Sequence, residues 1–193
     1  MTAERVNLEH ARSRVQVVPY SPKWPLLFER ERQVLAGALR EAAAQIHHIG
    51  STSVPDLCSK DTLDILVVTT DVTLVLQREQ ALDDAGYHLR DTARPHRCFF
   101  RRLEDGRRRV HLHAVERGHP EVDEYLLFRD FLRADSAERR EYGDYKVLLA
   151  RTSRDREEYV TTKQQHVTTL LDRARAWRAS KDAQLPREDV GSG

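Results

Sequence analysis

The segment TLDILVVTT, residues 62–70, constrains the fold more than any other part of the chain. It is rich in β-branched residues and almost wholly apolar, a pattern typical of a central strand that is buried on both faces. One acidic residue, Asp64, interrupts the run. A carboxylate inside such a strand is unfavourable unless it is paired or coordinated, so Asp64 is predicted to have a specific partner.

A turn of small residues lies just upstream of this strand. The short strand pattern QIHHI, residues 45–49, ends at Gly50. The hydroxyl residues that follow are Ser51, Thr52 and Ser53. A glycine permits a positive φ, and free amide groups in such a turn form a concavity that binds anions. With Asp64 on the next strand able to hold Mg²⁺, the sequence predicts a phosphate-binding turn that faces a metal-binding acid. A plain tight turn between two strands is the alternative interpretation.

Two histidines stand one strand step apart in VHLHAVE, residues 110–116. Strand alternation places His111 and His113 on one face, where they can ligate a metal, transfer protons or donate to a phosphate. The polar face of an edge strand is the alternative. Alternation sends His47 and His48 to opposite faces, so only one of them can point at the turn, and His48 is the candidate.

Basic residues outside the turn are further candidates for neutralising phosphate charge. These are Lys60, Arg129, Lys146 and Lys163. Arg129 is followed by Asp130, and this couple either clamps phosphate or locks a helix to the sheet. Lysines on helices with apolar neighbours are also commonly surface residues that extend their charge into water.

The rest of the pattern predicts one domain over residues 14–178, with a mobile N-terminus at 1–13 and a disordered tail at 179–193. The segment RVQVVPY (14–20) is predicted to form a strand. Ser21-Pro22 is predicted to begin a helix. Asp71 is predicted to cap a second helix that ends near Gly86.

Two longer segments complete the expected architecture. Residues 96–116 read as a hairpin that turns at Asp105-Gly106. From about residue 121 to 178 the pattern is helical, with breaks near 135–136 and 152–153. The predicted fold class is therefore α/β, with a small mixed sheet flanked by helices and a helical C-terminal third.

Composition excludes several classes of protein. The formal charge of +1 gives no overall attraction to nucleic acid or to an anionic membrane. Neither a membrane-length apolar run nor a secretory signal is present in the sequence. The two cysteines, Cys58 and Cys98, show no paired spacing and are interpreted as reduced thiols of a cytoplasmic protein.

Six ordered motifs resemble the GrpB family over about residues 15–177. They are HIGSTSVPDL, DILV, HLHAVE, LLFRDFLR, YKVLLA and YVTTKQQHV. The resemblance implies a nucleotidyltransferase-like fold, in which a Gly-Ser turn precedes a strand whose two acids bind two divalent metals.

This chain keeps Gly50-Ser51 and Asp64 but has Leu66 where the second acid would stand, a feature it shares with the family it resembles. It also carries Asp56 and Asp61 where the family usually has glycine and proline.

The expected function is metal-dependent transfer of a nucleotidyl or phosphoryl group from a nucleoside triphosphate to a small acceptor. Asp64 would bind Mg²⁺ or Mn²⁺, and His111 or His113 would complete the metal shell or act as base. The alternatives are a non-catalytic module that binds nucleotide or phosphate, and an enzyme that activates a small metabolite in the same pocket. Neither nucleic acid nor a membrane is an expected partner.

Overall fold

The computed structural model describes residues 15–104 and 108–183. The predicted mobile N-terminus, the tip of the predicted hairpin turn at residues 105–107 and the tail from residue 184 onward lie outside the described residues.

The sheet has five strands in the order β1-β2-β5-β4-β3. The strands are β1 (Gln45–Ile49), β2 (Thr62–Thr69), β3 (His88–Asp91), β4 (Arg97–Glu104) and β5 (Arg108–Glu116). β2 runs parallel to β5, and the other three neighbouring pairs are antiparallel. The sheet is therefore mixed, which confirms the predicted fold class.

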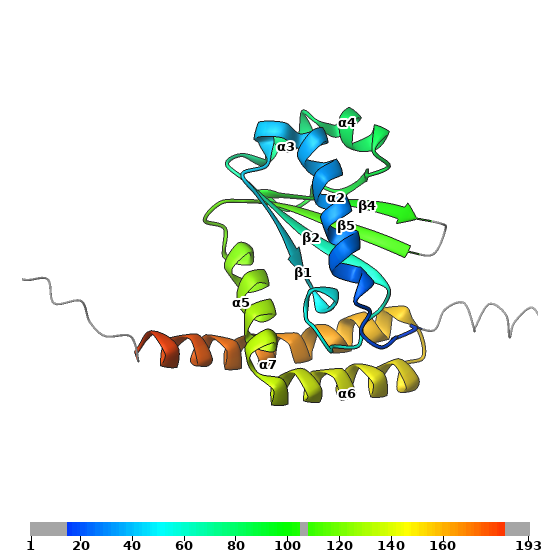
Figure 1. Ribbon diagram of the computed structural model, residues 1–193, viewed down its shortest axis with the longest axis vertical. Coiled ribbons are helices and arrows are strands. Elements are labelled where there is room, and N and C mark those ends of the chain that lie inside the picture. Colours follow the sequence, from blue (N-terminus) through cyan, green and yellow to red (C-terminus); the bar gives the residue numbers. More distant parts are fainter. Residues whose placement is uncertain (1–14, 105–107, 184–193) are drawn as a thin grey trace, which may run out of the picture.

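Helices cover both faces of the sheet. They are α2 (Lys23–Leu39), η1 (Arg40–Ala42), η2 (Ser51–Ser53), α3 (Val72–Leu76), α4 (Glu79–Asp84), α5 (Pro120–Ala134), α6 (Ser136–Thr152) and α7 (Arg156–Asp182). Figure 1 shows α2, α3 and α4 on one side of the sheet and α5 on the other. Ile65 of β2 packs in the core on the α2 side, whereas Leu66 packs with residues of α5, and both are fully buried. The central strand is thus covered on both faces, as its apolar sequence requires.

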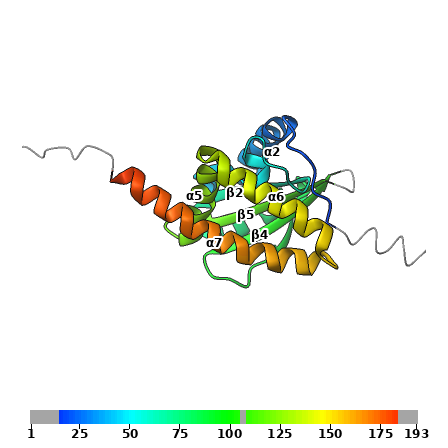
Figure 2. The ribbon, with the colours of Figure 1, turned by 90° about the horizontal axis from the view of Figure 1, so that it is seen from below.

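Helices α6 and α7 cross one end of the sheet and run side by side, and α5 packs against both of them (Figure 2). Their apolar residues enclose Val54 and Leu57, which follow the η2 turn. Asp135 caps α6 by accepting hydrogen bonds from the amides of Ala137 and Glu138. This cap lies at one of the two predicted helix breaks, and it aims α6 back toward the η2 turn.

Four local expectations differ from the structure. Residues 15–20 form only one bridge, between Val18 and Ser59, because Pro19 has no N–H to extend a ladder. The predicted helix after Asp71 is two short helices, α3 and α4.

Strand β3 was not predicted, since its four residues are too few to show a strand pattern. Helix α7 continues to Asp182, so residues 179–182 of the predicted tail are helical.

No helix in the described part of the chain is both long and apolar enough to cross a membrane.

Candidate functional site

Gly50 connects β1 to the η2 turn with a φ of 68°, as the glycine in the sequence predicts. Its backbone lies directly against Asp64, and a Cβ atom at position 50 would come 3.0 Å from the Asp64 Cβ. The turn is closed by Ser53, whose Oγ donates to the Gly50 carbonyl at 2.6 Å. The acid on β2 and the turn after β1 therefore form one site.

Asp64 and the two histidines meet at the centre of the sheet. The parallel register places Asp64 opposite His111, and alternation brings His113 to the same face, as predicted. The Nδ1 of His111 lies 3.1 Å from Asp64 Oδ1, and the Nε2 of His113 lies 4.0 Å from the same oxygen. The ring of Phe99 packs beside both imidazoles, with centroids 5.4 and 5.1 Å away. Tyr125 of α5 contacts His113 Nδ1 through its hydroxyl at 3.4 Å.

The protonation of Asp64 is controlled by these neighbours. Burial favours the neutral acid, but hydrogen bonds and charge interactions with His111 and His113 outweigh it and hold the pKa of Asp64 well below its ordinary value. The carboxylate is therefore ionised at neutral pH, and it fixes the orientation of the His111 ring.

Lys146 reaches the turn from α6, across 95 residues of sequence. Its side chain is buried, and Nζ donates to Ser51 Oγ at 2.9 Å and to the Cys58 carbonyl. The ammonium also lies 4.5 Å from the ring centre of Tyr142. Burial, with a smaller effect of nearby Lys163 and Lys60, lowers the pKa of Lys146 to about 7.

Two other predicted lysines lie in the same region. Burial lowers the pKa of Lys163 on α7, and the charge of Asp64 opposes this shift. Lys60 lies over the ring of Tyr159, with Nζ 5.4 Å from its centre. The structure thus brings Ser51, Lys146 and Lys163 together with Asp64.

Arg101 was not among the residues predicted from the sequence. It lies on β4 directly opposite His111, on the face that carries Phe99 and the two histidines. Its Nε is buried and has no hydrogen-bond partner among the described residues. A two-residue turn at Asp105-Gly106 would have paired Arg101 with Val110, so no signal in the sequence places Arg101 opposite His111.

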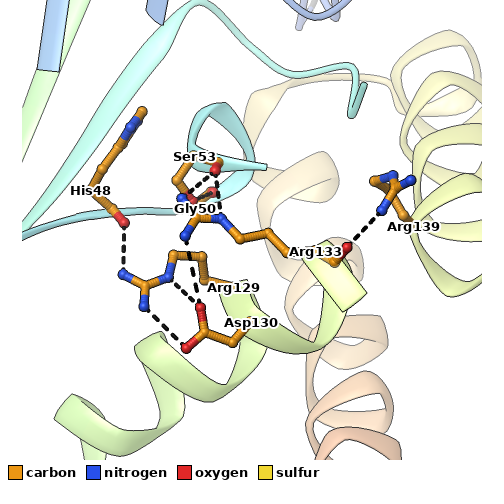
Figure 3. A network of polar contacts seen from close by, with 7 residues as sticks. All are labelled: His48, Gly50, Ser53, Arg129, Asp130, Arg133 and Arg139. Atoms are coloured by element: carbon orange, nitrogen blue, oxygen red, sulfur yellow. Dashed lines mark hydrogen bonds and ion pairs between the residues drawn. The ribbon is translucent and has the colours of Figure 1, made fainter. Parts of the chain in front are cut away.

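Two predicted phosphate ligands, His48 and Arg129, have other partners. The His48 ring stacks on Phe28 of α2 and lies 3.0 Å from Thr52 Oγ1 through Nε2. Arg129 donates from Nη1 to the carbonyl of His48, and its Nε and Nη2 donate to the two carboxylate oxygens of Asp130 (Figure 3). Alternation along β1 explains the position of His48, because its ring points toward α2 whereas Asp64 faces α5.

The expected divalent metal does not fit the side chains found here. Among the described residues, no group of three or more His, Cys, Asp or Glu side chains could hold a metal ion. Asp64 is the single acid of the cluster, its Oδ1 accepts from His111, and the second acid position is the buried Leu66. Mg²⁺ and Mn²⁺ prefer several oxygen ligands, which this donor set does not supply.

Comparisons with known proteins identify close relatives. A family model described as "GrpB protein" matches residues 14–173. The chain is 38% identical over 160 residues to a UPF0157 protein of Streptomyces coelicolor, covering 82% of this chain and 83% of that one. It is 36% identical over 166 residues to a UPF0157 protein of Halalkalibacterium halodurans, covering 84% and 83%.

Solved structures show the same relationship. The crystal structure of the conserved protein GrpB from Enterococcus faecalis matches with a TM-score of 0.77 and 29% identity, covering 84% of this chain and 99% of that one. A structure of Cid1 with its short product ApU matches with a TM-score of 0.46 and 14% identity, covering 74% and 44%.

Proposed function

This chain belongs to the GrpB family, and we propose that it binds the phosphates of a nucleoside triphosphate and transfers a nucleotidyl or phosphoryl group to a small acceptor. The observation that supports the proposal is the hydrogen-bonded Asp64–His111 pair, which lies near three cations that form no ion pair with another described residue. Such a site offers both a base and a place for an anion.

The cations support phosphate binding. Among the described residues, none of the ion pairs includes Lys146, Lys163 or Arg101. A buried ammonium without a counter-ion is unfavourable, and a bound phosphate relieves that cost. The hydroxyl of Ser51, which Lys146 already contacts, adds a donor at the mouth of the turn.

The Asp64–His111 pair supports proton transfer. Asp64 accepts from Nδ1 of His111, which fixes the tautomer and leaves Nε2 to act as general base. In the proposed reaction His111 Nε2 takes the proton of the acceptor hydroxyl while that oxygen forms a bond to phosphorus. The bond from phosphorus to the leaving phosphate oxygen breaks, and the leaving group departs as pyrophosphate or as a nucleoside diphosphate. Lys146, Lys163 and Arg101 stabilise the charge that develops on the phosphate oxygens.

This mechanism needs no metal held by the protein. The cationic side chains supply the positive charge that two metals would supply at a site with more acids. A Mg²⁺ ion that arrives on the nucleoside triphosphate would be part of the substrate.

The test combines calorimetry and phosphorus NMR. Titration with each of ATP, CTP, GTP and UTP identifies the nucleotide, and ³¹P spectra with a panel of hydroxyl acceptors detect transfer. His111→Gln should reduce turnover by about 10²–10⁴-fold while the nucleotide still binds, since general base catalysis contributes that much. Lys146→Met should weaken binding itself. His88→Gln, a change at an exposed histidine on β3, is the matched control and should alter neither.

A non-catalytic binding module is the second candidate, favoured by Leu66 at the position of the second acid. Nucleotide binding that depends on Lys146, with no transfer to any acceptor in the panel, would favour this module over the enzyme. If no nucleoside triphosphate binds, both candidates are wrong.

A further inference from the structure

A cleft of about 470 Å³ opens between α2, the η2 turn and the junction of α5 with α6. Neither Asp64 nor Lys146 lines it. Its volume lies within the range of about 300–1,000 Å³ that is typical of small-molecule sites. It is therefore separate from the candidate active site, although Ser53 of the same turn contributes to its wall.

One wall of the cleft is aromatic. Phe28 and His48 stack with their ring centres 4.8 Å apart and their planes at 11°, and Tyr20 lies in the same lining. Burial lowers the pKa of His48 to about 4, so the imidazole is neutral at neutral pH. These rings offer flat apolar surface to a ligand, and His48 adds no charge.

The opposite wall is cationic and held in place by the backbone (Figure 3). Arg133 donates from Nε and Nη2 to the Ser53 carbonyl, at 3.0 and 2.7 Å. Arg139 donates from Nη1 to the carbonyls of Leu132 and Arg133, at 2.9 and 3.1 Å. Each guanidinium keeps further N–H groups beyond these bonds, since arginine has five donors.

Acidic side chains among the described residues neutralise this wall only in part. The carboxylate nearest to Arg133 is that of Asp130, 3.9 Å from Nη1, and both of its oxygens already accept from Arg129. Arg139 takes part in none of the ion pairs found between described residues. Burial and, to a smaller extent, the charge of Arg129 lower the pKa of Arg133, and the charge of Asp130 opposes this shift.

The net charge of the residues that line the cleft suits an anion with one negative charge. Two arginines and one acid, Asp56, leave a single excess positive charge around the cleft. A carboxylate carries one negative charge, whereas a phosphate group carries about 1.5 to 2. Guanidinium groups also bind planar carboxylates with well-aligned hydrogen bonds.

We propose that this cleft is a second binding site, for a small aromatic carboxylate. The carboxylate lies between Arg133 and Arg139, and the ring lies against Phe28 and Tyr20. The site is independent of the reaction proposed above. It assigns His48 to a ring-stacking surface.

The first experiment is isothermal titration calorimetry of the whole chain with three probes. Indole-3-acetate has both the ring and the charge, indole-3-acetamide keeps the ring without the charge, and acetate keeps the charge without the ring. We expect saturable binding of indole-3-acetate and at least about tenfold weaker binding of the other two, since each lacks one of the two contacts. Equal affinity for the acetate and the acetamide of indole, or no saturable binding of indole-3-acetate, would overturn the proposal.

Variants then locate the bound probe. Arg133→Gln and Arg139→Gln should each weaken indole-3-acetate by about tenfold, and Phe28→Leu should weaken it without removing a charge. Arg140→Gln, which changes an exposed arginine of α6 outside the cleft, is the matched control and should have no effect. Arg139 also caps the end of α5, so thermal unfolding of each variant establishes that it is folded. If the folded Arg133→Gln and Phe28→Leu proteins both bind like the wild type, the proposal is wrong.

One further variant separates the two sites. Asp64→Asn changes the candidate active site and should leave the affinity for indole-3-acetate unchanged. Loss of binding in Asp64→Asn, with full binding in Arg133→Gln, would place the probe at the other site and overturn the proposal.

Discussion

The backbone of Gly50 and the side chain of Asp64 are in contact across the first two strands, so closely that position 50 has no room for a Cβ atom. The contact joins the end of β1 to the beginning of β2, and it depends on a φ of 68° at the glycine. Both the turn and the acid therefore hold their positions through one residue that lacks a side chain.

Gly50→Ala should lower the free energy of unfolding by at least about 2 kcal/mol. The substitution adds a strained positive φ to a steric clash with Asp64, and each effect contributes about 1–3 kcal/mol. Urea unfolding of the two proteins measures the difference. Gly37→Ala is the matched control, because that glycine lies in α2 with open space around it. This control should raise stability by about 0.5–1 kcal/mol, and an equal loss in both variants would contradict the role of the Gly50–Asp64 contact.

Asp64→Asn should destabilise the protein in a way that depends on pH. The pKa of Asp64 in the fold lies below its ordinary value of 3.8. The ionised carboxylate therefore stabilises the native state fully at pH values above 3.8. This contribution is lost as the pH falls below 3.8 and through the folded pKa. The difference in unfolding free energy between wild type and variant should therefore narrow on acidification. Urea unfolding between about pH 2.5 and 6 measures it.

The same comparison in a His111→Gln background gives the control for Asp64. One of the hydrogen bonds that lower the pKa of Asp64 is absent in this background. The difference in unfolding free energy caused by Asp64→Asn should therefore decrease less on acidification. An equal decrease of this difference with and without His111 would show that His111 does not stabilise the carboxylate.

Lys146→Met should change the free energy of unfolding most at and below pH 7. The pKa of Lys146 falls from 10.5 to about 7 in the fold, so the unfolded chain binds more protons between these values. Stability contributed by this residue therefore rises with pH over that interval, and the penalty of the buried charge is largest at and below pH 7. Replacing Lys146 with Met should flatten the rise, which urea unfolding at several pH values between 6.5 and 10 measures.

Anion binding at the turn should take up a proton through the same lysine. At pH 8 most of Lys146 is neutral because its pKa is about 7, and a phosphate beside Nζ favours the charged form. Calorimetric titration with the nucleoside triphosphate that binds, in two buffers of different ionisation enthalpy, reports the uptake. Lys146→Met should abolish it, whereas Lys181→Met, at an exposed site on α7, should not. Equal uptake in wild type and Lys146→Met would contradict this assignment.

Asp56 occupies a backbone position with a φ of 64°, where glycine is favoured. Aspartate tolerates this conformation better than alanine, because its short polar side chain forms local hydrogen bonds. Asp56→Ala should therefore lower the free energy of unfolding by about 1–2 kcal/mol. Asp56→Gly should leave it unchanged or raise it slightly, and thermal unfolding distinguishes the two. A larger loss with glycine than with alanine would show that the Asp56 side chain itself stabilises the loop.

Local sequence determined much of the architecture. The apolar run around Asp64 predicted a central strand because only burial on both faces accommodates such residues. The helix breaks near residues 135 and 153 followed from capping chemistry, and the positive φ of Gly50 followed from the absence of a Cβ. Strand alternation was enough to place His111 and His113 on one face.

Tertiary structure decided which charges meet at the turn. Helical spacing shows that Lys146 and Lys163 lie among apolar residues, but it does not show where α6 and α7 cross the sheet. Arg101 lies at the site because β4 pairs with β5. His48 lies outside the site because its ring points from β1 toward α2. These contacts join residues far apart in the chain, so they depend on packing between elements and not on the pattern within any one of them.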